Sequence, residues 1–184
     1  MIKLDRVSMA YGEKQVLRDL SLAFKAGRHY AILGPSGRGK TTLLRLIAGL
    51  EKPQSGQIAL PGSAKIAFCF QEDRLLPWKT VLENVELACG EKETAQRWLS
   101  RVGLGGEENA YPVSLSGGMK RRAALARALA YDADILLMDE PFRALDADMH
   151  AQMLRLLKET AKEKLLILVT HDKADAAGMQ VVRL

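Results

Sequence analysis

The sequence predicts an α/β fold, with a mainly parallel sheet in the core and antiparallel strands beside it. Two apolar runs, 135–138 and 165–169, have the length and composition of buried strands. Segments with helical periodicity separate such runs, and this alternation is typical of a parallel sheet in a three-layered core. Two regions depart from the pattern: the N-terminal part, in which polar and apolar residues alternate, and a middle part without strand signals.

Length and composition limit the possible classes of protein. A chain of 184 residues corresponds to one domain, or to one domain with a small insertion. The net charge of +5 is spread along the chain, so it does not indicate nucleic-acid binding. The two cysteines form no metal or disulfide pattern, which favours a reducing compartment. The N-terminus lacks the apolar segment of a secretory signal, and no run spans a bilayer, so we expect a cytoplasmic protein that reaches a membrane only through a partner.

The first residues predict two antiparallel strands. Ile2, Leu4 and Val7 alternate with charged residues, so we expect an edge strand there. A turn at 11–13 leads to a second apolar run at 16–24.

Residues 34–42 read GPSGRGKTT and stand between an apolar strand at 30–33 and a helix at 41–50. Glycines let successive backbone N–H groups point at phosphate oxygens, and the start of the helix favours the same anion. In this pattern Lys40 meets the outer phosphates and Thr41 gives its hydroxyl to Mg²⁺, whereas Arg38 fills a free position. We therefore predict a phosphate loop that binds a nucleoside triphosphate, formed by Gly34, Pro35, Ser36, Gly37, Arg38, Gly39, Lys40, Thr41 and Thr42.

A short hairpin and a helical insertion follow the loop. We expect strands at 57–60 and 65–70, joined tightly through Pro61 and Gly62. Helices are expected at 80–89 and 92–102, the second with Trp98 and Leu99 on its apolar face.

Residues 115–129 read LSGGMKRRAALARAL, and a helix is expected over 116–130. Ser116, Gly117 and Gly118 open this helix and form a second potential anion site. One chain with one phosphate loop has no evident use for a second site, so we expect a head-to-tail pair in which each chain closes over the nucleotide of its partner. The alternative is a capped helix whose glycines allow tight packing.

Residues 134–141 read DILLMDEP, so a buried strand at 135–138 is followed by two acidic residues. Asp139 can hold Mg²⁺ through its water shell, and Glu140 is placed to polarise a water molecule for attack on the γ-phosphate. The alternative is a strand that simply ends in an acidic turn. Further on, we expect a helix at 145–160 and the strand at 165–169, which is followed by Thr170 and His171. A short helix is expected at 172–177 and a strand at 180–184.

In these motifs and their order the chain resembles the nucleotide-binding subunits of ABC transporters over essentially its whole length. The resemblance implies a P-loop NTPase of the ABC type, one domain over 1–184 with a RecA-like core at 1–71 and 131–184 and a helical insertion at 72–130. It also implies ATP and Mg²⁺ as cofactors. The site residues that it implies are Tyr11 stacking on adenine, Gln71 near Mg²⁺ and the attacking water, residues 115–119 as the signature motif, Glu140 as catalytic base, Asp146 in the D-loop and His171 contacting the γ-phosphate. The residues alone also allow a turn residue at Tyr11, a polar strand end at Gln71 and a surface histidine at His171.

The resemblance further implies an ATPase subunit that forms a homodimer with ATP and energises a transmembrane permease from the cytoplasmic face of the membrane. Residues 70–85 are most similar to the importers of nitrate, taurine and aliphatic sulfonates, which also use an extracytoplasmic substrate-binding protein. Residues 75–78, LLPW, lie where this family docks its permease, although Trp78 could instead pack inside the insertion. An ABC exporter, or a soluble ABC ATPase outside transport, remains the alternative. Arg143 departs from the small residue usual before the D-loop, and the sequence ends at Leu184 without the usual C-terminal extension.

Overall fold

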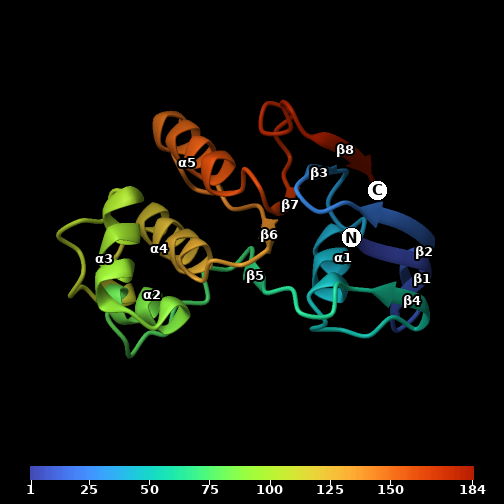
Figure 1. Cartoon of the computed structure of the whole chain (residues 1–184), viewed down its shortest axis with the longest axis horizontal. Coiled ribbons are helices and arrows are strands. Elements are labelled where there is room, and N and C mark those ends of the chain that lie inside the picture. The colour runs from blue at the N-terminus through green and yellow to red at the C-terminus, as the bar shows by residue number, and fades with distance from the viewer. The chain divides into compact units, whose positions relative to one another are not determined.

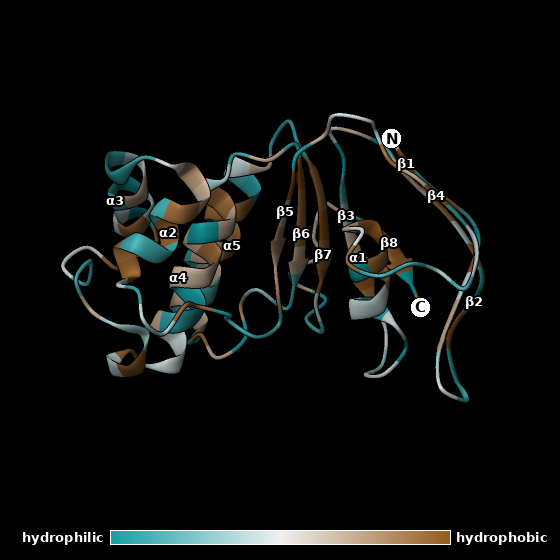
Figure 2. Cartoon of the chain, turned by 90° about the horizontal axis from the view of Figure 1, so that it is seen from below, coloured by the Kyte–Doolittle hydropathy of each residue, from teal (hydrophilic) through white to brown (hydrophobic).

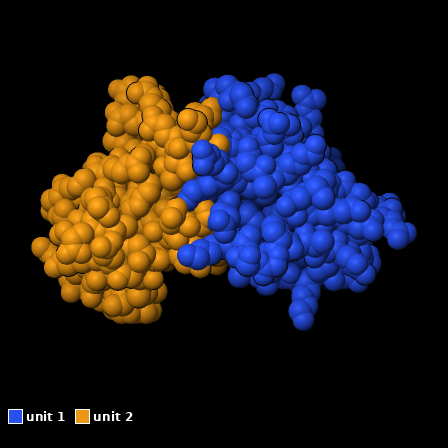
Figure 3. All heavy atoms as spheres, in the orientation of Figure 1, with its two compact units in different colours: residues 1–66, 134–139, 163–184 blue, residues 67–133, 140–162 orange.

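The structure is a computed structural model that describes residues 1–184, and its contacts divide the chain into two units. Unit 1 contains 1–66, 134–139 and 163–184, and unit 2 contains 67–133 and 140–162 (Figure 3). The domain boundaries expected from the sequence stay a prediction, because the two units are defined by which residues contact one another and do not test those boundaries. Each unit is described by itself.

An antiparallel sheet of three strands forms one part of unit 1. Its strands are β1 (Ile2–Tyr11), β2 (Lys14–Phe24) and β4 (Ser55–Ala59), in the order β2-β1-β4 (Figure 1). The expected edge position of the first strand is wrong, because β1 pairs on one side with β2 and on the other with β4. The alternation of Ile2, Leu4 and Val7 with charged residues marks a buried and an exposed face, and it carries no information about pairing along the strand edges.

A parallel sheet forms the other part of unit 1. Strands β6 (Ile135–Asp139), β7 (Leu165–Val169), β3 (His29–Leu33) and β8 (Gln180–Arg183) pair in this order, all in parallel. Every residue of β6 and β7 is buried, and both strands are hydrophobic except for Asp139 at the end of β6 (Figure 2). Helix α1 (Lys40–Ile47) follows β3 and packs near β6. The predicted α/β fold with a parallel core and an antiparallel part is confirmed.

Two local predictions are wrong. The hairpin expected over 57–70 does not form, because β4 pairs with β1 in a three-stranded sheet that does not contain β5 (Ile66–Cys69). The helix expected at 172–177 is instead a series of turns. There the Asp172 carboxylate accepts a hydrogen bond from the Ala174 N–H at 2.8 Å, so it captures a backbone donor that a helix would need.

Unit 2 is built from helices α2 (Val81–Cys89), α3 (Lys92–Arg101), α4 (Gly117–Ala130) and α5 (Ala147–Thr160), with a short 3₁₀ turn at Pro112–Ser114. The first three helices pack against one another. Helix α2 starts with a capping box between Thr80 and Glu83, and the Thr80 hydrogen bonds lower the pKa of the Glu83 carboxyl. The helices expected in the insertion are thus confirmed, with Leu99 fully buried and Trp98 partly so. No helix has the length and apolar character needed to cross a membrane.

Gly56 in β4 gives a stability prediction. Its φ is +81°, and a Cβ there would lie 2.3 Å from the carbonyl oxygen of Arg6. Gly56→Ala is therefore expected to lower the free energy of unfolding by about 1–3 kcal/mol, as strained backbone positions do. The thermal midpoint should fall by about 2–4 °C for each kcal/mol.

Gly62→Ala is the matched control, since a Cβ at Gly62 would meet no atom within 4 Å. A thermal scan in which the two variants melt together would contradict the prediction.

Candidate functional site

The phosphate loop, residues 34–42, joins β3 to α1 in unit 1. Gly37 and Gly39 have φ angles of 78° and 85°, in the left-handed region that favours glycine. A Cβ on Gly39 would also lie 2.8 Å from the Val16 side chain, so no larger residue fits there. No side chain caps the start of α1. Its first N–H groups are therefore available to an anion.

The ammonium group of Lys40 lies across this loop. Only 6% of Lys40 is exposed, and its Nζ donates hydrogen bonds to the carbonyl oxygens of Gly34 at 2.7 Å and Pro35 at 2.9 Å. The fold thus buries one positive charge beneath the turn of the loop, where an anion bound to the backbone N–H groups would meet it.

Three predicted segments leave the parallel sheet at one level. Val169 in β7 is in register with Ile32 in β3 and with Asp139 in β6. The phosphate loop begins two residues after Ile32, and His171 follows Val169 by the same interval. Asp139 is 1% exposed, whereas His171 is exposed. Unit 1 therefore gathers the loop, Asp139 and His171 at the carboxyl edge of the sheet, where parallel α/β folds bind ligands.

A buried pair orders the turn that contains His171. The Thr170 hydroxyl donates to the Asp175 carboxylate at 2.5 Å and accepts from the Asp172 N–H at 3.1 Å. Thr170 and Asp175 are both nearly inaccessible to solvent. The backbone on either side of His171 is therefore fixed, although its own side chain is exposed.

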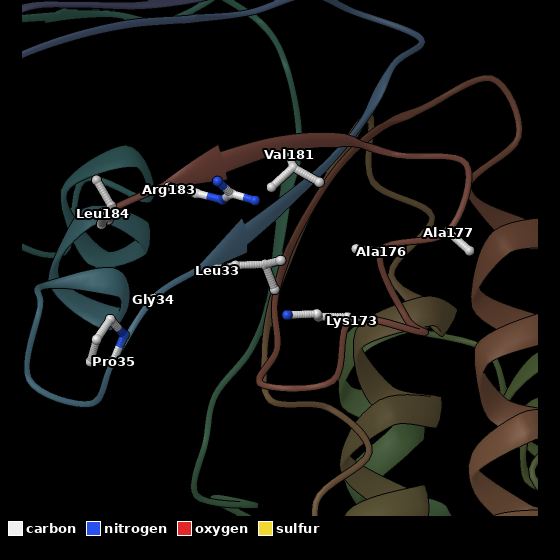
Figure 4. A pocket seen from close by; sticks show the side chains of 9 residues that line it. All are labelled: Leu33, Gly34, Pro35, Lys173, Ala176, Ala177, Val181, Arg183 and Leu184. Atoms are coloured by element: carbon white, nitrogen blue, oxygen red, sulfur yellow. The ribbon is translucent and has the colours of Figure 1, made fainter.

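A pocket of about 550 Å³ is lined in part by Gly34 and Pro35, the first two residues of the same loop (Figure 4). Leu33, Val181 and Leu184 form apolar walls, and the side chains of Lys173 and Arg183 extend beside them.

Tyr11 ends β1, and its hydroxyl donates to the carboxylate of Glu51. Arg45 forms an ion pair with the same carboxylate at 3.4 Å. Because 45% of Tyr11 remains exposed, the ring is anchored at its hydroxyl and has free surface for stacking.

In unit 2, Gln71 and Glu140 lie together. The Gln71 amide donates to the Glu140 carboxylate at 3.4 Å, although the two residues are 69 positions apart. Glu140 has a φ of 48°, which is uncommon for a residue with a side chain and occurs often at functional sites. The arrangement places an amide next to a carboxylate at the end of a buried strand.

The start of α4 lies beside this pair. Ser116 is the N-cap, and its hydroxyl accepts a hydrogen bond from the Met119 N–H at 3.2 Å. A pocket of about 300 Å³ is lined by Gly117, Gln71 and Arg143, among others. Asp146 caps α5 by accepting from the Met149 N–H at 2.9 Å. Unit 2 therefore brings the start of the signature helix to the Gln71 segment, while the Asp146 carboxylate is engaged by its own helix.

The sequence reasoning assigned no role to two arginines on α4 that contact this region. Arg121 is 2% exposed and binds backbone carbonyls on both sides of the Gln71–Glu140 pair. Arg127 donates to the carbonyl oxygens of Asp73 at 3.0 Å and Arg74 at 2.8 Å, and burial lowers the pKa of its guanidinium. The sequence contained one signal for these roles: both arginines lie on a helix that is rich in alanines, most of which are buried.

The chain is similar in sequence and in fold to known proteins. Residues 17–143 match the family model described as ABC transporter. The chain is 45% identical over 185 residues to aliphatic sulfonates import ATP-binding protein SsuB 1 of Rhodococcus jostii (strain RHA1), covering 96% of this chain and 76% of the relative. It is 46% identical over 188 residues to the SsuB protein of Burkholderia pseudomallei (strain K96243), of which it spans 57%.

A solved structure is similar throughout the chain. It is the dimeric post-hydrolysis state of the ATP-binding cassette MJ0796 with bound ADP and Pi, which superposes with a TM-score of 0.90 at 33% identity. The match covers 100% of this chain and 94% of that one.

Proposed function

The chain belongs to the ABC transporter family, and on this premise we propose that it is the subunit that binds and hydrolyses ATP to drive a membrane importer. The observation that carries the proposal is the carboxyl edge of the parallel sheet, where the phosphate loop, Asp139 and His171 leave neighbouring strands at one level. The names of the relatives favour import over export.

ATP binding is assigned to unit 1. We propose that residues 34–42 wrap the phosphates with backbone N–H groups, that Lys40 neutralises their outer charge and that the exposed ring of Tyr11 stacks on adenine. The buried position of Lys40 beneath the loop supports this role.

We assign the hydrolytic roles to the acidic residues and to the polar residues near them. Glu140 acts as the base that polarises the attacking water, Gln71 orients that water, and His171 contacts the γ-phosphate. Thr41 and Gln71 would supply hydroxyl and amide oxygens, the hard donors that Mg²⁺ prefers, and Asp139 would hold the ion through its water shell. The ion would neutralise phosphate charge during transfer. The hydrogen bond between Gln71 and Glu140 supports their joint assignment.

We propose that ATP holds two copies of the chain together. Residues 116–118 and Asp146 of one copy would face the nucleotide of the other. The positive N-terminal end of α4 suits an anion, and the similar MJ0796 cassettes are dimers.

Residues 75–78 are the proposed contact with the permease. Asn84, fully buried, holds the backbone of Leu76 through its side-chain oxygen at 2.7 Å and its amide at 3.1 Å. This rigid turn leaves 70% of Trp78 exposed, so Trp78 does not pack inside the helical insertion. A large exposed aromatic side chain on a fixed turn is typical of a binding surface.

Trp78→Ala is expected to weaken binding to the permease by about 2 kcal/mol or more, as for an aromatic residue at the centre of an interface. Co-purification with the permease measures the loss, and an unchanged thermal midpoint shows that folding is intact.

Val113→Ala is the control, because Val113 is 84% exposed and lies outside the turn. Equal retention of the permease by both variants would exclude residues 75–78 as the contact.

The transported compound is proposed to be an aliphatic sulfonate or a similarly small anion, because the relatives are named for sulfonate import. We place the subunit on the cytoplasmic face of the membrane, with an extracytoplasmic binding protein delivering the cargo to the complex.

Reconstitution tests the function. The protein and its permease are reconstituted in liposomes. The binding protein and labelled alkanesulfonate are added on the side of the membrane opposite the ATPase subunit. The label should cross the membrane only when Mg²⁺-ATP is present on the side of the ATPase subunit. Parallel assays with nitrate and taurine define the substrate class. ATP-driven movement of the labelled compound in the opposite direction would overturn the proposal. So would a wild-type complex that hydrolyses no ATP, or one whose hydrolysis Glu140→Gln leaves intact.

A further inference from the structure

Arg121 is a buried side chain that joins two separate segments of unit 2. Its Nη1 donates to the carbonyl oxygens of Phe70 at 2.6 Å and Gln71 at 3.3 Å. Its Nη2 donates to the carbonyl of Glu140 at 2.7 Å, and its Nε to that of Pro141 at 2.9 Å. One guanidinium therefore binds the backbone beside both members of the Gln71–Glu140 pair.

The charge of Arg121 is compensated by its surroundings. Its Nη1 also lies 3.3 Å from the carboxylate of Asp73, which is itself partly buried. A buried cation is stable only with such a set of acceptors, and the planar guanidinium matches several of them at fixed angles. A lysine could not make this pattern of bonds.

The bond to the Glu140 carbonyl has a particular consequence. Glu140 has a φ of 48°, a conformation that costs energy for a residue with a Cβ and persists only where neighbours hold it. Arg121 donates hydrogen bonds to the carbonyl oxygen of that residue and to the carbonyl oxygen of Gln71. It therefore fixes the backbone from which both side chains project.

We propose that Arg121 is a positioning residue that ties the signature helix to Gln71 and Glu140, so that movement of the helix start reaches the hydrolytic residues of the same chain. The proposal rests on the function proposed above. Arg121 lies in the second turn of α4, close behind Ser116 and Gly117, and Gly117, Gln71 and Arg121 line one pocket. ATP bound by the partner at residues 116–118 would thereby influence hydrolysis at the chain's own site and make the two sites cooperative.

The same helix supplies two control arginines. Arg122 donates only to the carbonyl oxygens of Val102 and Gly103, both at 2.7 Å, at the end of α3. Arg127 binds the carbonyls of Asp73 and Arg74 and so holds only the segment that carries Gln71. The variants R121Q, R122Q and R127Q therefore each remove one positive charge from the same helix. They differ in which backbone segment loses its hydrogen bonds to that helix.

Amide hydrogen exchange tests the positioning without any need for ATPase activity. R121Q should speed exchange both at 70–73 and at 140–142, since both segments lose a clamp. R122Q should speed exchange at 102–104, and R127Q at 73–74 but not at 140–142. If R121Q leaves 140–142 as protected as in the wild type, Arg121 does not position Glu140, whatever the hydrolysis assays give.

Steady-state hydrolysis tests the coupling. R121Q is expected to lower kcat by about 10- to 100-fold, as small misplacements of reacting groups do, with KM for ATP nearly unchanged. Its Hill coefficient for ATP should fall toward about 1, whereas R122Q keeps the wild-type coefficient and most of kcat. R121K, which keeps the charge without the fork, should recover only part of kcat and replaces R121Q if that variant fails to fold.

Equal losses of kcat in R121Q and R122Q at matched folded fraction would show that Arg121 is only structural. A wild-type protein that hydrolyses no ATP, even with its permease, would instead remove the proposed function and leave the exchange result standing.

Discussion

Glu140→Gln is expected to lower the rate of ATP hydrolysis by about 10²- to 10⁴-fold, the range that a general base contributes. The substitution keeps the size of the side chain, and the amide oxygen of glutamine can still accept the hydrogen bond that Gln71 donates. The Arg121 bond goes to the backbone carbonyl of residue 140, so the strained backbone also stays clamped. Only the basicity of the carboxylate is lost.

ATP affinity should therefore remain within a few-fold of the wild type, and the ATP-bound dimer should accumulate because hydrolysis no longer ends it. Phosphate release measures the rate, and light scattering with ATP measures the dimer. Glu159→Gln, which removes an exposed carboxylate from α5 in the same unit, should leave both readouts unchanged. Hydrolysis by Glu140→Gln at the rate of the control would assign the base to another residue.

The phosphate loop could be predicted from sequence because its pattern encodes local requirements: glycines at positive φ and a cation at the first turn of a helix. The strand at 165–169 was predicted with its true bounds for a similar reason, since an apolar run between polar residues fits only a buried strand there. Both signals are complete within a few residues.

Pairing and charge burial depend on distant residues, and there the sequence was less informative. The residues of β4 do not distinguish pairing with β1 from pairing with a hairpin partner, so the expected hairpin had no local evidence against it. Arg121 was predicted only as part of an arginine-rich helix, because its acceptors are carbonyls 19 to 51 positions away. A charge on a helix is usually solvated, and only the tertiary structure showed this one to be buried.

Lys40→Met is expected to weaken ATP binding by about 10- to 150-fold, which corresponds to the loss of about 1.5–3 kcal/mol from a charged hydrogen bond. The side chain volume is similar, but the ammonium that would meet the outer phosphates is gone. Hydrolysis should fall further than affinity, because negative charge on the phosphate oxygens must be stabilised during transfer. Calorimetric titration with ATP in the presence of EDTA measures binding without turnover.

The same substitution removes the hydrogen bonds to Gly34 and Pro35, so a loss of binding could come from a disordered loop rather than from the missing charge. Lys40→Arg separates these causes, because it keeps a cation that can reach the loop carbonyls and should retain more affinity than methionine at equal thermal stability. Lys52→Met removes an exposed lysine after α1 and should bind ATP like the wild type. If Lys40→Met binds ATP with wild-type affinity, the buried ammonium serves only to shape the loop, and the phosphates are held by backbone N–H groups alone.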